Sequence, residues 1–390
     1  MKGSKIGILT GGGDVPGLNS VIKSVVYRAT ELGRDVVGIR RGWEGLTHMD
    51  PSVDIDPKYV WKLSRENTRA IDRTGGTVLH TSRTNPSKML QAKLPQTYSR
   101  ETLSRYRFNE GIYDLTPLVL DNLEKLGIST LIAIGGDDTL SYAARLDREG
   151  FPVVAIPKTM DNDVQNTEYC IGFSTAITRA KELINRQRTT CGSHERIGVF
   201  RIFGRDAGFT ALYTGYVTST RCLIPELTFD VDRVCTLLTE DKRNNPSNYS
   251  LVVVSEGATW EGRELQEYGE ADAYGHRKKV DIGEALAAEI KRRTGEDTMS
   301  SDLTYDLRSG DPDSVDHLTA ITFANIALDL VADNVSGRMV GIQDGNYACS
   351  EIPKPTAGAR QVDLDALYNV DRYRPRYDNK VGKPLLLTTL

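Results

Sequence analysis

The sequence predicts an α/β protein with mostly parallel sheets, and three observations support this fold class. Short apolar runs, such as Leu131–Ile134 and Val153–Ile156, end in turn residues and are typical of buried strands. The segments between such runs have the apolar spacing of amphipathic helices, as in Leu140–Arg145. The chain has 390 residues, more than one average domain holds. We therefore expect two layered α/β domains.

The expected elements alternate along the chain. A strand at Lys5–Leu9 is followed by a glycine-rich turn and by a helix with Val21, Ile22, Val25, Val26 and Ala29 on one face. The polar segment from Asp50 to Tyr113 is expected to form loops with short helices. Next we expect a helix to Leu126, strands to Ile134 and Ile156, and a helix capped by Ser174. Strands at Arg196–Ile202 and Ser250–Gly257 follow. The helix at Ile282–Arg293 is expected to stop at Gly295.

Composition excludes several classes of protein. The net charge of −4 argues against a general nucleic-acid partner. No apolar stretch approaches the ~20 residues that span a bilayer, so no membrane partner is expected. The apolar part of the first segment ends after a few residues, as in the first strand of a cytoplasmic protein. The five cysteines form no CxxC pair, which favours isolated buried thiols in a reducing compartment.

Four acidic residues follow two neighbouring strands. Asp137 and Asp138 stand in the turn GGDDT, and Asp161 and Asp163 stand in the turn PKTMDND. Carboxyl ends of parallel strands are where α/β sheets bind ligands. Four carboxylates would repel one another there unless a cation or a reacting group were present. Asp137 is well placed to hold Mg²⁺ through its oxygens.

The same turns contain what phosphoryl transfer requires. In extended backbone, residues two apart point to one side, so Asp161 and Asp163 can face a single site. One of them can take the proton of an attacking hydroxyl, while Thr159 donates a hydrogen bond to a phosphate oxygen. For any one acid, a solvated surface turn is the alternative. The occurrence of both turns at consecutive strand ends favours the catalytic interpretation.

A third turn precedes them. Gly11–Asp14 follows the first strand and opens a helix, where backbone N–H groups can approach an anion. Pro16 occupies the place of the last glycine of GxGxxG, and no GxxxxGK[ST] occurs, so the dinucleotide and P-loop interpretations weaken. A tight structural turn remains the alternative for this motif alone.

Together these motifs resemble the 6-phosphofructokinase family. The resemblance rests on TGGGDVPGLN, GGDDT and PKTMDND, and it continues in order through GGTVLHTSR, SHERI, FGRDAG, SEG and YDLRSG. The GGDDT turn also resembles that of lipid and NAD kinases, but the later motifs have no counterpart there. The family implies two Rossmann-like three-layer domains with the active site in the cleft between them. Residues 1–172 and about 307–345 would bind the phosphoryl donor, and 173–306 and about 346–390 the sugar phosphate.

The resemblance also implies roles for individual residues. Asp161 matches the general base, and at an ordinary pKa near ~4 it would be ionised at neutral pH. Asp163 would assist it, Asp137 would organise Mg²⁺, and Arg205 would bind the substrate or the moving phosphoryl group. The expected donor-binding residues are Gly12, Gly13, Arg83, Gly136, Asp138 and Lys158. The expected sugar-phosphate residues are Arg196, Phe203, Gly204, Glu256, Tyr305 and Arg308.

Some positions depart from the family pattern. Phe203 stands where methionine is usual, and Tyr305 replaces a phosphate-facing histidine but still carries one donor. The arginine that matches Arg196 reaches in from a neighbouring subunit in the family, so at least a homodimer is implied. Met299 lies about where bacterial ATP-dependent members place a second intersubunit arginine, so dimer and tetramer both stay open.

The phosphoryl donor depends on Asp138 and Lys158. ATP-dependent relatives generally carry glycine at the position of Asp138, which leaves room for the α-phosphate and ribose. An aspartate fills that space and repels the α-phosphate by on the order of 1–4 kcal/mol per charge pair. The resemblance therefore implies pyrophosphate and fructose 6-phosphate as substrates. An ATP-dependent 6-phosphofructokinase is the first alternative, and a non-catalytic regulatory subunit that senses sugar phosphates is the second.

Overall fold

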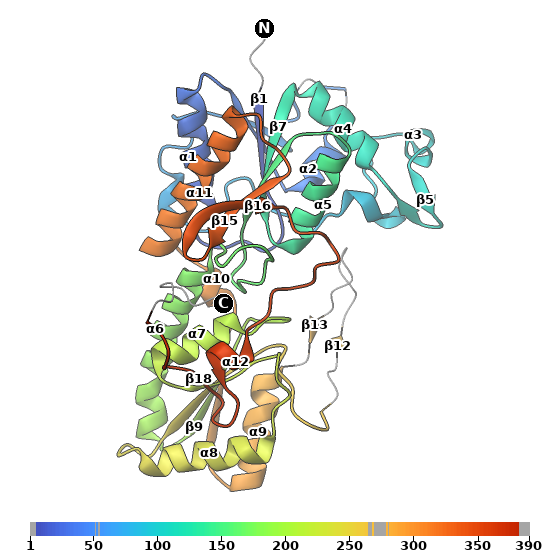
Figure 1. Cartoon of the computed structure of the whole chain (residues 1–390). Helices are drawn as coiled ribbons and strands as arrows, with labels where there is room; N and C mark the ends of the chain where they lie inside the picture. Colours follow the sequence, from blue (N-terminus) through green and yellow to red (C-terminus); the bar gives the residue numbers. More distant parts are fainter. Residues whose placement is uncertain are drawn as a thin grey trace.

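The computed structural model describes residues 5–50, 52–53, 55–263, 267–268, 278–279 and 281–381. The chain forms two lobes, each built around one mainly parallel sheet covered by helices (Figure 1). The predicted α/β class with mostly parallel sheets is confirmed.

The larger lobe contains a seven-stranded sheet in the order β16-β15-β8-β7-β1-β2-β3. The strands are β1 (Lys5–Thr10), β2 (Val36–Ile39), β3 (Val60–Leu63), β7 (Ile128–Gly135), β8 (Val153–Pro157), β15 (Arg338–Gln343) and β16 (Asn346–Glu351). The two edge strands, β3 and β16, run antiparallel to their neighbours, and the five central strands are parallel. The turns after β1, β7 and β8 therefore meet at one edge.

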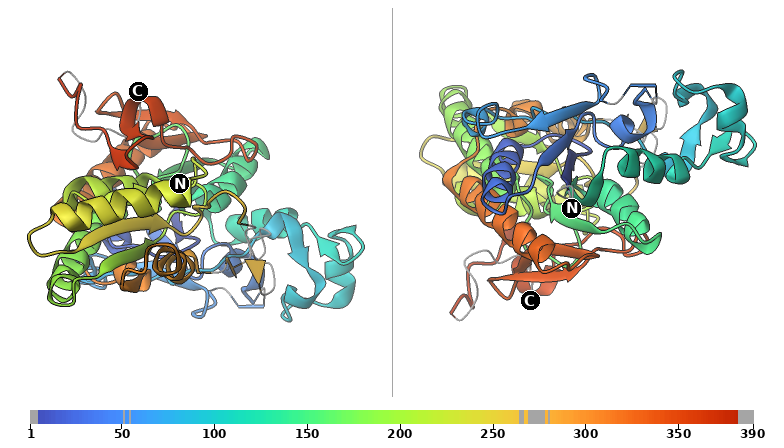
Figure 2. Two further views of the ribbon diagram at one scale, coloured as in Figure 1. Left: turned by 90° about the horizontal axis from the view of Figure 1, so that it is seen from below. Right: turned by 90° about the horizontal axis from the view of Figure 1, so that it is seen from above.

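Helices cover both faces of this sheet. On one face lie α1 (Leu18–Glu31) and α11 (Ser314–Ala332), and on the other lie α2 (Trp43–His48), α4 (Thr116–Lys125) and α5 (Asp137–Arg148) (Figures 1 and 2). Side chains of β7 alternate between the two faces, as the period of a strand requires. Ile132 and Ile134 belong to the core under α1, whereas Leu131 and Ala133 belong to the core under α4.

The segment between β2 and α4 holds more regular structure than expected. It contains the edge strand β3, where only loops and short helices were predicted. It also contains a small three-stranded sheet. Its other elements are η1 (Ile71–Arg73), η2 (Pro86–Lys88), β4 (Met89–Leu90), η3 (Gln91–Lys93), α3 (Arg100–Ser104), β5 (Arg107–Asn109) and β6 (Ile112–Tyr113), where η denotes a 3₁₀-helix.

The smaller lobe contains a parallel sheet in the order β10-β11-β9-β14. Its strands are β9 (Ile197–Ile202), β10 (Arg221–Leu223), β11 (Ser250–Ser255) and β14 (Thr298–Leu303). Its helices are α6 (Phe173–Ser193), α7 (Phe209–Thr218), α8 (Val231–Asn244), α9 (Ile282–Thr294), α10 (Tyr305–Arg308) and α12 (Leu364–Leu367). Two short pairs complete it: β12 (Glu267–Tyr268) with β13 (Lys278–Lys279), and β17 (Tyr368–Asn369) with β18 (Arg374–Pro375).

Two predicted helix ends had different outcomes. Helix α9 ends at Gly295 with φ of 73°, a left-handed conformation that glycine adopts without strain, and this prediction is confirmed. Ser174 does not cap α6, because the helix begins at Phe173 after Gly172. The Ser174 hydroxyl instead donates to Asp313 Oδ2 at 2.7 Å and ties α6 to the start of α11.

The chain crosses between the lobes more than once. It enters the smaller lobe after β8, returns before α11, and leaves the larger lobe again after the β15–β16 hairpin (Figure 1). The expected boundary at about residue 345 falls in the turn of that hairpin. Because β16 pairs with β15 along its whole length, the last crossing follows Glu351.

Two expectations from composition need correction. Within the described residues, α11 is long and apolar enough to span a membrane, although no such stretch was predicted. It packs against the sheet and α1 and buries Phe323 and Leu328, as the core helix of a globular protein does. Four cysteines are buried as expected, but Cys349 on the edge strand β16 is exposed.

Candidate active site

A cavity of about 640 Å³ lies between the lobes, at the edge where β1, β7, β8 and β9 end. Its volume lies within the range of small-molecule sites. It is lined by residues from all three predicted turns and from the smaller lobe. The predicted site residues that line it are Gly12, Gly13, Arg83, Gly136, Asp137, Asp138, Lys158, Thr159, Asp161, Asp163, Phe203, Arg205, Glu256 and Arg308.

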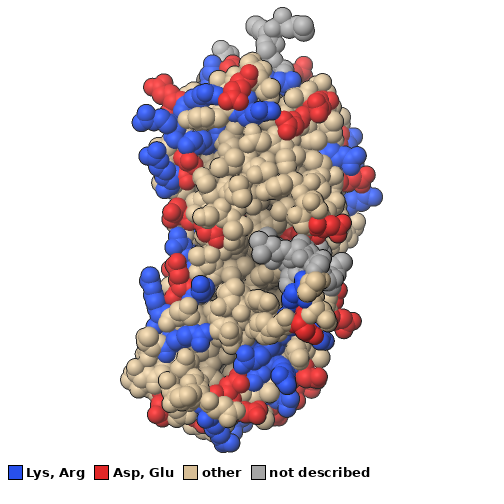
Figure 3. Space-filling view, turned by 60° about the vertical axis from the view of Figure 1, so that its left-hand side comes forward, with Lys and Arg blue, Asp and Glu red and all other residues tan. Residues whose placement is uncertain are grey.

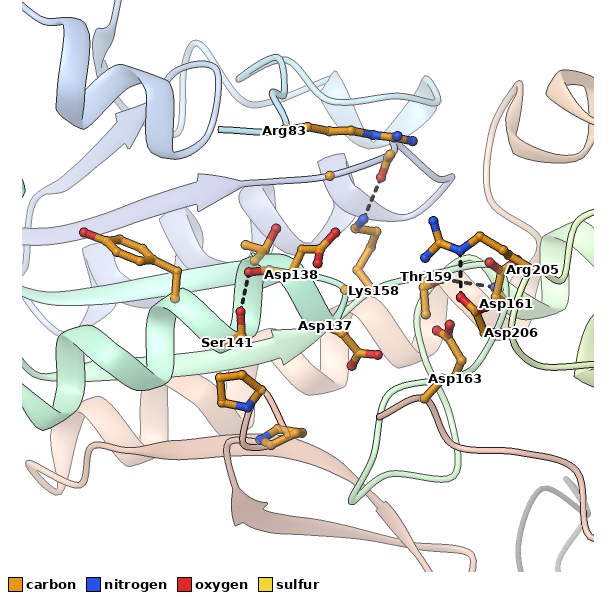
Figure 4. A pocket seen from close by; sticks show the side chains of 18 of the residues that line it. Arg83, Asp137, Asp138, Ser141, Lys158, Thr159, Asp161, Asp163, Arg205 and Asp206 are labelled. Atoms are coloured by element: carbon orange, nitrogen blue, oxygen red, sulfur yellow. Dashed lines mark hydrogen bonds and ion pairs between the residues drawn. The ribbon is translucent and has the colours of Figure 1, made fainter. Parts of the chain in front are cut away.

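The turn after β1 is held by a lysine from another turn. Lys158 is only 3% exposed, and its Nζ donates to the carbonyl oxygen of Gly13 at 2.6 Å. Gly12 has φ of 78°, a conformation that disfavours a side chain. The lysine thus places positive charge directly behind a backbone that lines the cavity (Figure 4).

The turn after β7 opens helix α5. Gly136 precedes the helix, and both Asp137 and Asp138 lie in its first turn. A Cβ atom on Gly11 would come within 2.5 Å of Thr139 Oγ1, so the β1 and β7 turns touch only because position 11 is glycine. In Figure 4, Asp138 faces the part of the cavity below Arg83, whereas Asp137 points toward Asp163. The two neighbouring aspartates therefore face different parts of the cavity.

The turn after β8 brings Asp161 and Asp163 into the same cavity, as predicted, but for a different reason. The backbone is not extended there, because Asn162 has φ of 56°. The buried Asn162 side chain accepts a hydrogen bond from Cys170 N at 2.8 Å and donates to Glu168 O at 2.9 Å. These bonds hold a left-handed residue between the two acids. Thr159 Oγ1 accepts from Asp161 N at 3.2 Å.

The acidic residues share one poorly solvated region. Burial, and next the charges of Asp163 and Asp138, raise the pKa of Asp137 to about 8. Burial, Asp163 and Glu256 raise the pKa of Asp161 well above its ordinary value. The pKa of Asp163 is also raised, chiefly by burial. The expectation of an ordinary pKa for Asp161 is therefore wrong.

Such a cluster fits a divalent cation that the substrate also binds. Asp161 Oδ1 is buried and has no hydrogen-bond partner. Within the described residues, no three acidic, histidine or cysteine side chains come close enough to enclose a metal. Mg²⁺ is usually held by one or two carboxylates together with water and substrate phosphates. Asp137 and Asp163 offer that incomplete set of ligands.

Two cations balance the acids. Burial, and next the charge of Arg308, lower the pKa of Lys158 from 10.5 to about 8. Arg205 Nε donates to Asp206 Oδ2 at 2.6 Å, so its guanidinium is held at the cavity wall. Both groups can present N–H donors to phosphate oxygens.

The smaller lobe forms the other end of the cavity. The guanidinium of Arg308 lies 4.6 Å from the ring centre of Phe203 and lines the cavity. Glu256 Oε2 accepts from Arg201 Nη2 at 3.0 Å, and Arg201 also binds Asp302 at 2.6 Å. Arg201 was not predicted. Its position one residue before the end of β9, at the cavity edge, could have revealed it in the sequence.

Three predicted residues do not line the cavity. Arg196 precedes β9 and so lies at the end of that strand opposite the cavity. Tyr305 is 74% exposed, although its ring lies 5.9 Å from the Arg308 guanidinium. Gly204, with φ of 125°, forms the turn that carries Arg205. A single chain thus leaves Arg196 outside the site.

The cavity also contains residues that the sequence reasoning missed. They lie on α5, on and just before η2, in the turns after β1 and β9, and in the segment after β16. The helical spacing from Asp138 could have revealed Ser141, Arg145 and Arg148, which continue one face of α5. The contribution of the segment after β16 had no local signal. The further lining residues include Asp14, Asn85, Lys88, Arg145, Arg148, Asp206, Pro353, Lys354, Pro355 and Gln361.

The family model described as Phosphofructokinase matches residues 5–331 of this chain. The chain therefore belongs to the phosphofructokinase family, and the predicted resemblance is confirmed.

Individual relatives agree with this membership. A pyrophosphate–fructose 6-phosphate 1-phosphotransferase of Streptomyces coelicolor is 39% identical over 93% of this chain and 97% of its own length. ATP-dependent 6-phosphofructokinase 3 of the same organism is 33% identical over 87% of this chain and 91% of its own length. The crystal structure of a pyrophosphate-dependent phosphofructokinase from Marinobacter aquaeolei superposes with a TM-score of 0.72. It is 17% identical and covers 97% of this chain and 90% of its own, which shows the shared fold.

Proposed function

We propose that this protein transfers a phosphoryl group reversibly from pyrophosphate to the 1-hydroxyl of fructose 6-phosphate. The products are fructose 1,6-bisphosphate and phosphate, and the reaction belongs to glycolysis and gluconeogenesis. The larger lobe binds the donor and the smaller lobe binds the sugar phosphate. The relative in Streptomyces coelicolor that carries this name supports the proposal, since it aligns over nearly its whole length.

The observation that carries the choice of donor is that Asp138 and Lys158 both line this cavity. Asp138 fills the space beside the first turn of α5 with a carboxylate. A nucleotide would place its α-phosphate and ribose against that charge, whereas pyrophosphate ends before it. Lys158, buried behind Gly13, supplies positive charge where phosphate oxygens approach the backbone.

Asp161 and Asp163, in the turn after β8, act on the proton of the sugar hydroxyl. Asp161 accepts the proton of the sugar hydroxyl as that oxygen attacks phosphorus. Its raised pKa makes it a stronger base than an exposed aspartate once it is ionised. Thr159 and Arg205 donate hydrogen bonds to the moving phosphoryl group, and Asp163 orients the reacting groups.

Mg²⁺ is part of the proposal. It would be held by Asp137, with Asp163 beside it, and would supply positive charge that neutralises the phosphate oxygens. Without such a cation, a pKa of about 8 leaves Asp137 largely protonated near neutral pH.

The sugar phosphate occupies the end of the cavity at Glu256 and Arg308. Glu256, fixed by Arg201, accepts hydrogen bonds from ring hydroxyls, and Arg308 binds the 6-phosphate. The Arg308 guanidinium packs against the ring of Phe203. Tyr305, at the surface beside Arg308, donates one more hydrogen bond to the 6-phosphate.

The site is completed by a second copy of the chain. Arg196 lies outside its own cavity, so we infer that it reaches the 6-phosphate of a neighbouring subunit in a homodimer or homotetramer. The side of the molecule that carries α1, α11 and α6 has a broad area without charged side chains (Figure 3). Exposed apolar residues of α11, namely Val315, Leu318 and Ile321, suit a contact between copies. The assembly would be cytoplasmic.

Steady-state kinetics test the proposal directly. Rates on fructose 6-phosphate are measured with pyrophosphate or ATP as donor, each with and without Mg²⁺. We expect activity with pyrophosphate that requires Mg²⁺ and little with ATP. Good activity with ATP and none with pyrophosphate would support the ATP-dependent alternative. Sugar-phosphate binding without turnover by either donor would support a regulatory subunit.

A further inference from the structure

The segment that follows β16 carries a buried arginine beside the active site. Gly358, Ala359 and Gln361 line the cavity, whereas Arg360 does not. Arg360 is only 6% exposed, and its guanidinium lies 4.2 Å from the ring centre of Phe209, at the start of α7. Burying a guanidinium is costly unless its donors are satisfied, so the groups that it binds indicate its role.

Arg360 is bonded to the turn that carries the catalytic acids. Its Nη2 donates to the carbonyl oxygen of Asn162 and, at 3.3 Å, to that of Glu168. Its backbone N–H donates to the carbonyl oxygen of Asp163 at 2.6 Å. The side chain and the backbone of one residue therefore hold the turn after β8 by its carbonyl groups.

The bonds from Arg360 meet the strained part of this turn. Asn162, between Asp161 and Asp163, has φ of 56°. A residue with a side chain keeps such a conformation only where the surrounding bonds hold it. The carbonyl groups of Asn162 and Asp163 belong to the two peptide groups that flank the Asp163 side chain. Arg360 therefore fixes the backbone on both sides of that acid.

The same segment also holds the loop that carries Arg205. Two residues after Arg360, Val362 N donates to Glu226 Oε1 at 2.9 Å. The same oxygen accepts from Gly208 N at 2.8 Å, where the loop after β9 enters α7. The segment after β16 thus connects the turn of the acids with the loop of the arginine at the cavity wall.

We propose that Arg360 is a positioning residue, which sets the backbone around Asn162 and so aligns Asp161 and Asp163 with the reacting groups. This inference rests on the proposed function, because it concerns the roles assigned there to the two acids. Arg360 lies outside the cavity, so it should affect the chemical step more than the binding of substrates. A displacement of about 1 Å at a reacting group can lower a rate by about 10²-fold.

Two substitutions at this position and one matched control test the inference. Arg360→Met keeps an unbranched side chain but removes the charge and the donors, whereas Arg360→Lys keeps a charged donor. The control is Arg221→Met. Arg221 is also a buried arginine, 5% exposed, but it binds Asp241 at 2.7 Å from β10, away from the catalytic turns. For each variant, kcat, both KM values and Tm are measured with pyrophosphate and fructose 6-phosphate.

We expect the variants to separate the chemical step from substrate binding. In Arg360→Met, kcat should fall about tenfold or more, while both KM values stay within about threefold of the wild type. Arg360→Lys should recover most of the loss, because an ammonium group can still donate to the Asn162 carbonyl oxygen. Arg221→Met should lower Tm, since it leaves Asp241 with fewer partners, but it should keep the wild-type kcat.

Hydrogen exchange gives a second readout that does not depend on activity. The Cys170 N–H donates to Asn162 Oδ1, so its exchange reports whether the turn keeps its conformation. This amide should exchange faster in Arg360→Met than in the wild type, and Arg360→Lys should restore its protection. Arg221→Met should change it no more than it changes the amides of β7.

Several results would overturn the inference. Wild-type kcat in Arg360→Met, or unchanged exchange of the Cys170 amide, would show that the turn keeps its shape without this side chain. An equal fall of kcat in Arg221→Met would assign the effect to stability. A raised KM with wild-type kcat would assign Arg360 to substrate binding. If Arg360→Met does not fold, Arg360→Gln, with its shorter side chain, decides by the same measurements.

Failure of the proposed function would look different. It would appear as wild-type protein without activity on pyrophosphate. The exchange of the Cys170 amide in the Arg360 variants would still show whether this arginine holds the turn.

Discussion

Lys158 and Gly13 join two turns that lie 145 residues apart, because the lysine Nζ donates to the glycine carbonyl oxygen at 2.6 Å. The ammonium group is buried, and this one hydrogen bond aims it at the backbone that lines the donor end of the cavity. The turn after β1 and the turn after β8 therefore act as one binding unit. Its charge state depends on a single side chain.

That dependence predicts a pH effect on donor binding. Burial lowers the pKa of Lys158 to about 8, so the charged form is lost as pH rises through that value. We expect kcat/KM for pyrophosphate to fall up to tenfold per pH unit above about pH 8. Lys158→Met should be less active and should lack this decline, which separates the effect from ionisation of pyrophosphate itself.

The lowered pKa of Lys158 also affects the stability of the fold, which should rise with pH where donor binding falls. The unfolded chain keeps Lys158 protonated up to its ordinary pKa of 10.5, so it binds more protons than the folded chain between pH 8 and 10.5. The free energy of unfolding contributed by this group therefore increases with pH across that window. Lys158→Met should remove the increase in urea denaturation. A steeper loss of stability in the wild type than in Lys158→Met would contradict this sign.

Asp138→Gly should admit ATP as a donor. The change removes a side chain and a negative charge from the first turn of α5, and the repulsion it relieves is on the order of 1–4 kcal/mol. We expect kcat/KM with ATP to rise at least tenfold. Asp138→Asn keeps the size without the charge, so a smaller rise there would divide the effect between charge and space. No gain in either variant would remove Asp138 as the basis of donor choice.

Asp161→Asn should lose activity and gain stability. Removing the general base should lower kcat by about 10²–10⁴-fold. The ionised carboxylate is disfavoured by burial and by Asp163, so a neutral amide should raise Tm by about 2 °C or more. Asp365→Asn, an exposed control, should change neither quantity. Near-normal kcat in Asp161→Asn would assign the proton transfer elsewhere.

Asp316→Ala should destabilise the whole chain. This buried carboxylate accepts from Tyr169 Oη, Gly172 N, Thr175 N and Thr175 Oγ1 at 2.6–2.8 Å. Alanine would leave all four donors without a partner, at a cost of about 3 kcal/mol or more. Asp329→Ala removes an exposed acid from the same helix and should cost less than about 1 kcal/mol. Similar midpoints for both variants in urea would contradict the argument.

The sequence predicted the three turns because each follows an apolar strand, and parallel strands bring such turns to one edge. It predicted Asp161 and Asp163 in one site, but the backbone reasoning was wrong. The two acids face one cavity because Asn162 between them is left-handed, not because the chain is extended. It could not predict the raised pKa of Asp161. That shift depends on burial by distant segments and on Glu256, which lies 95 residues later.

The outer end of the cavity was missed for a similar reason. Lys354 reaches it only because the chain returns from the β15–β16 hairpin across the cleft, and no local pattern encodes that path. Arg145 and Arg148 did carry a signal, the helical spacing from Asp138, but a basic helix face is usually a solvated surface. Arg196 and Tyr305 were taken from the family pattern, and their roles stay predictions.

The two lobes share one continuous hydrophobic core. The cluster that contains Ile132 of the larger sheet extends without a break to Val253 of the smaller one. We therefore expect the two lobes to melt together in a single cooperative transition. Because separating the lobes would expose that core to water, we expect substrates to enter by movement of surface segments around the cavity.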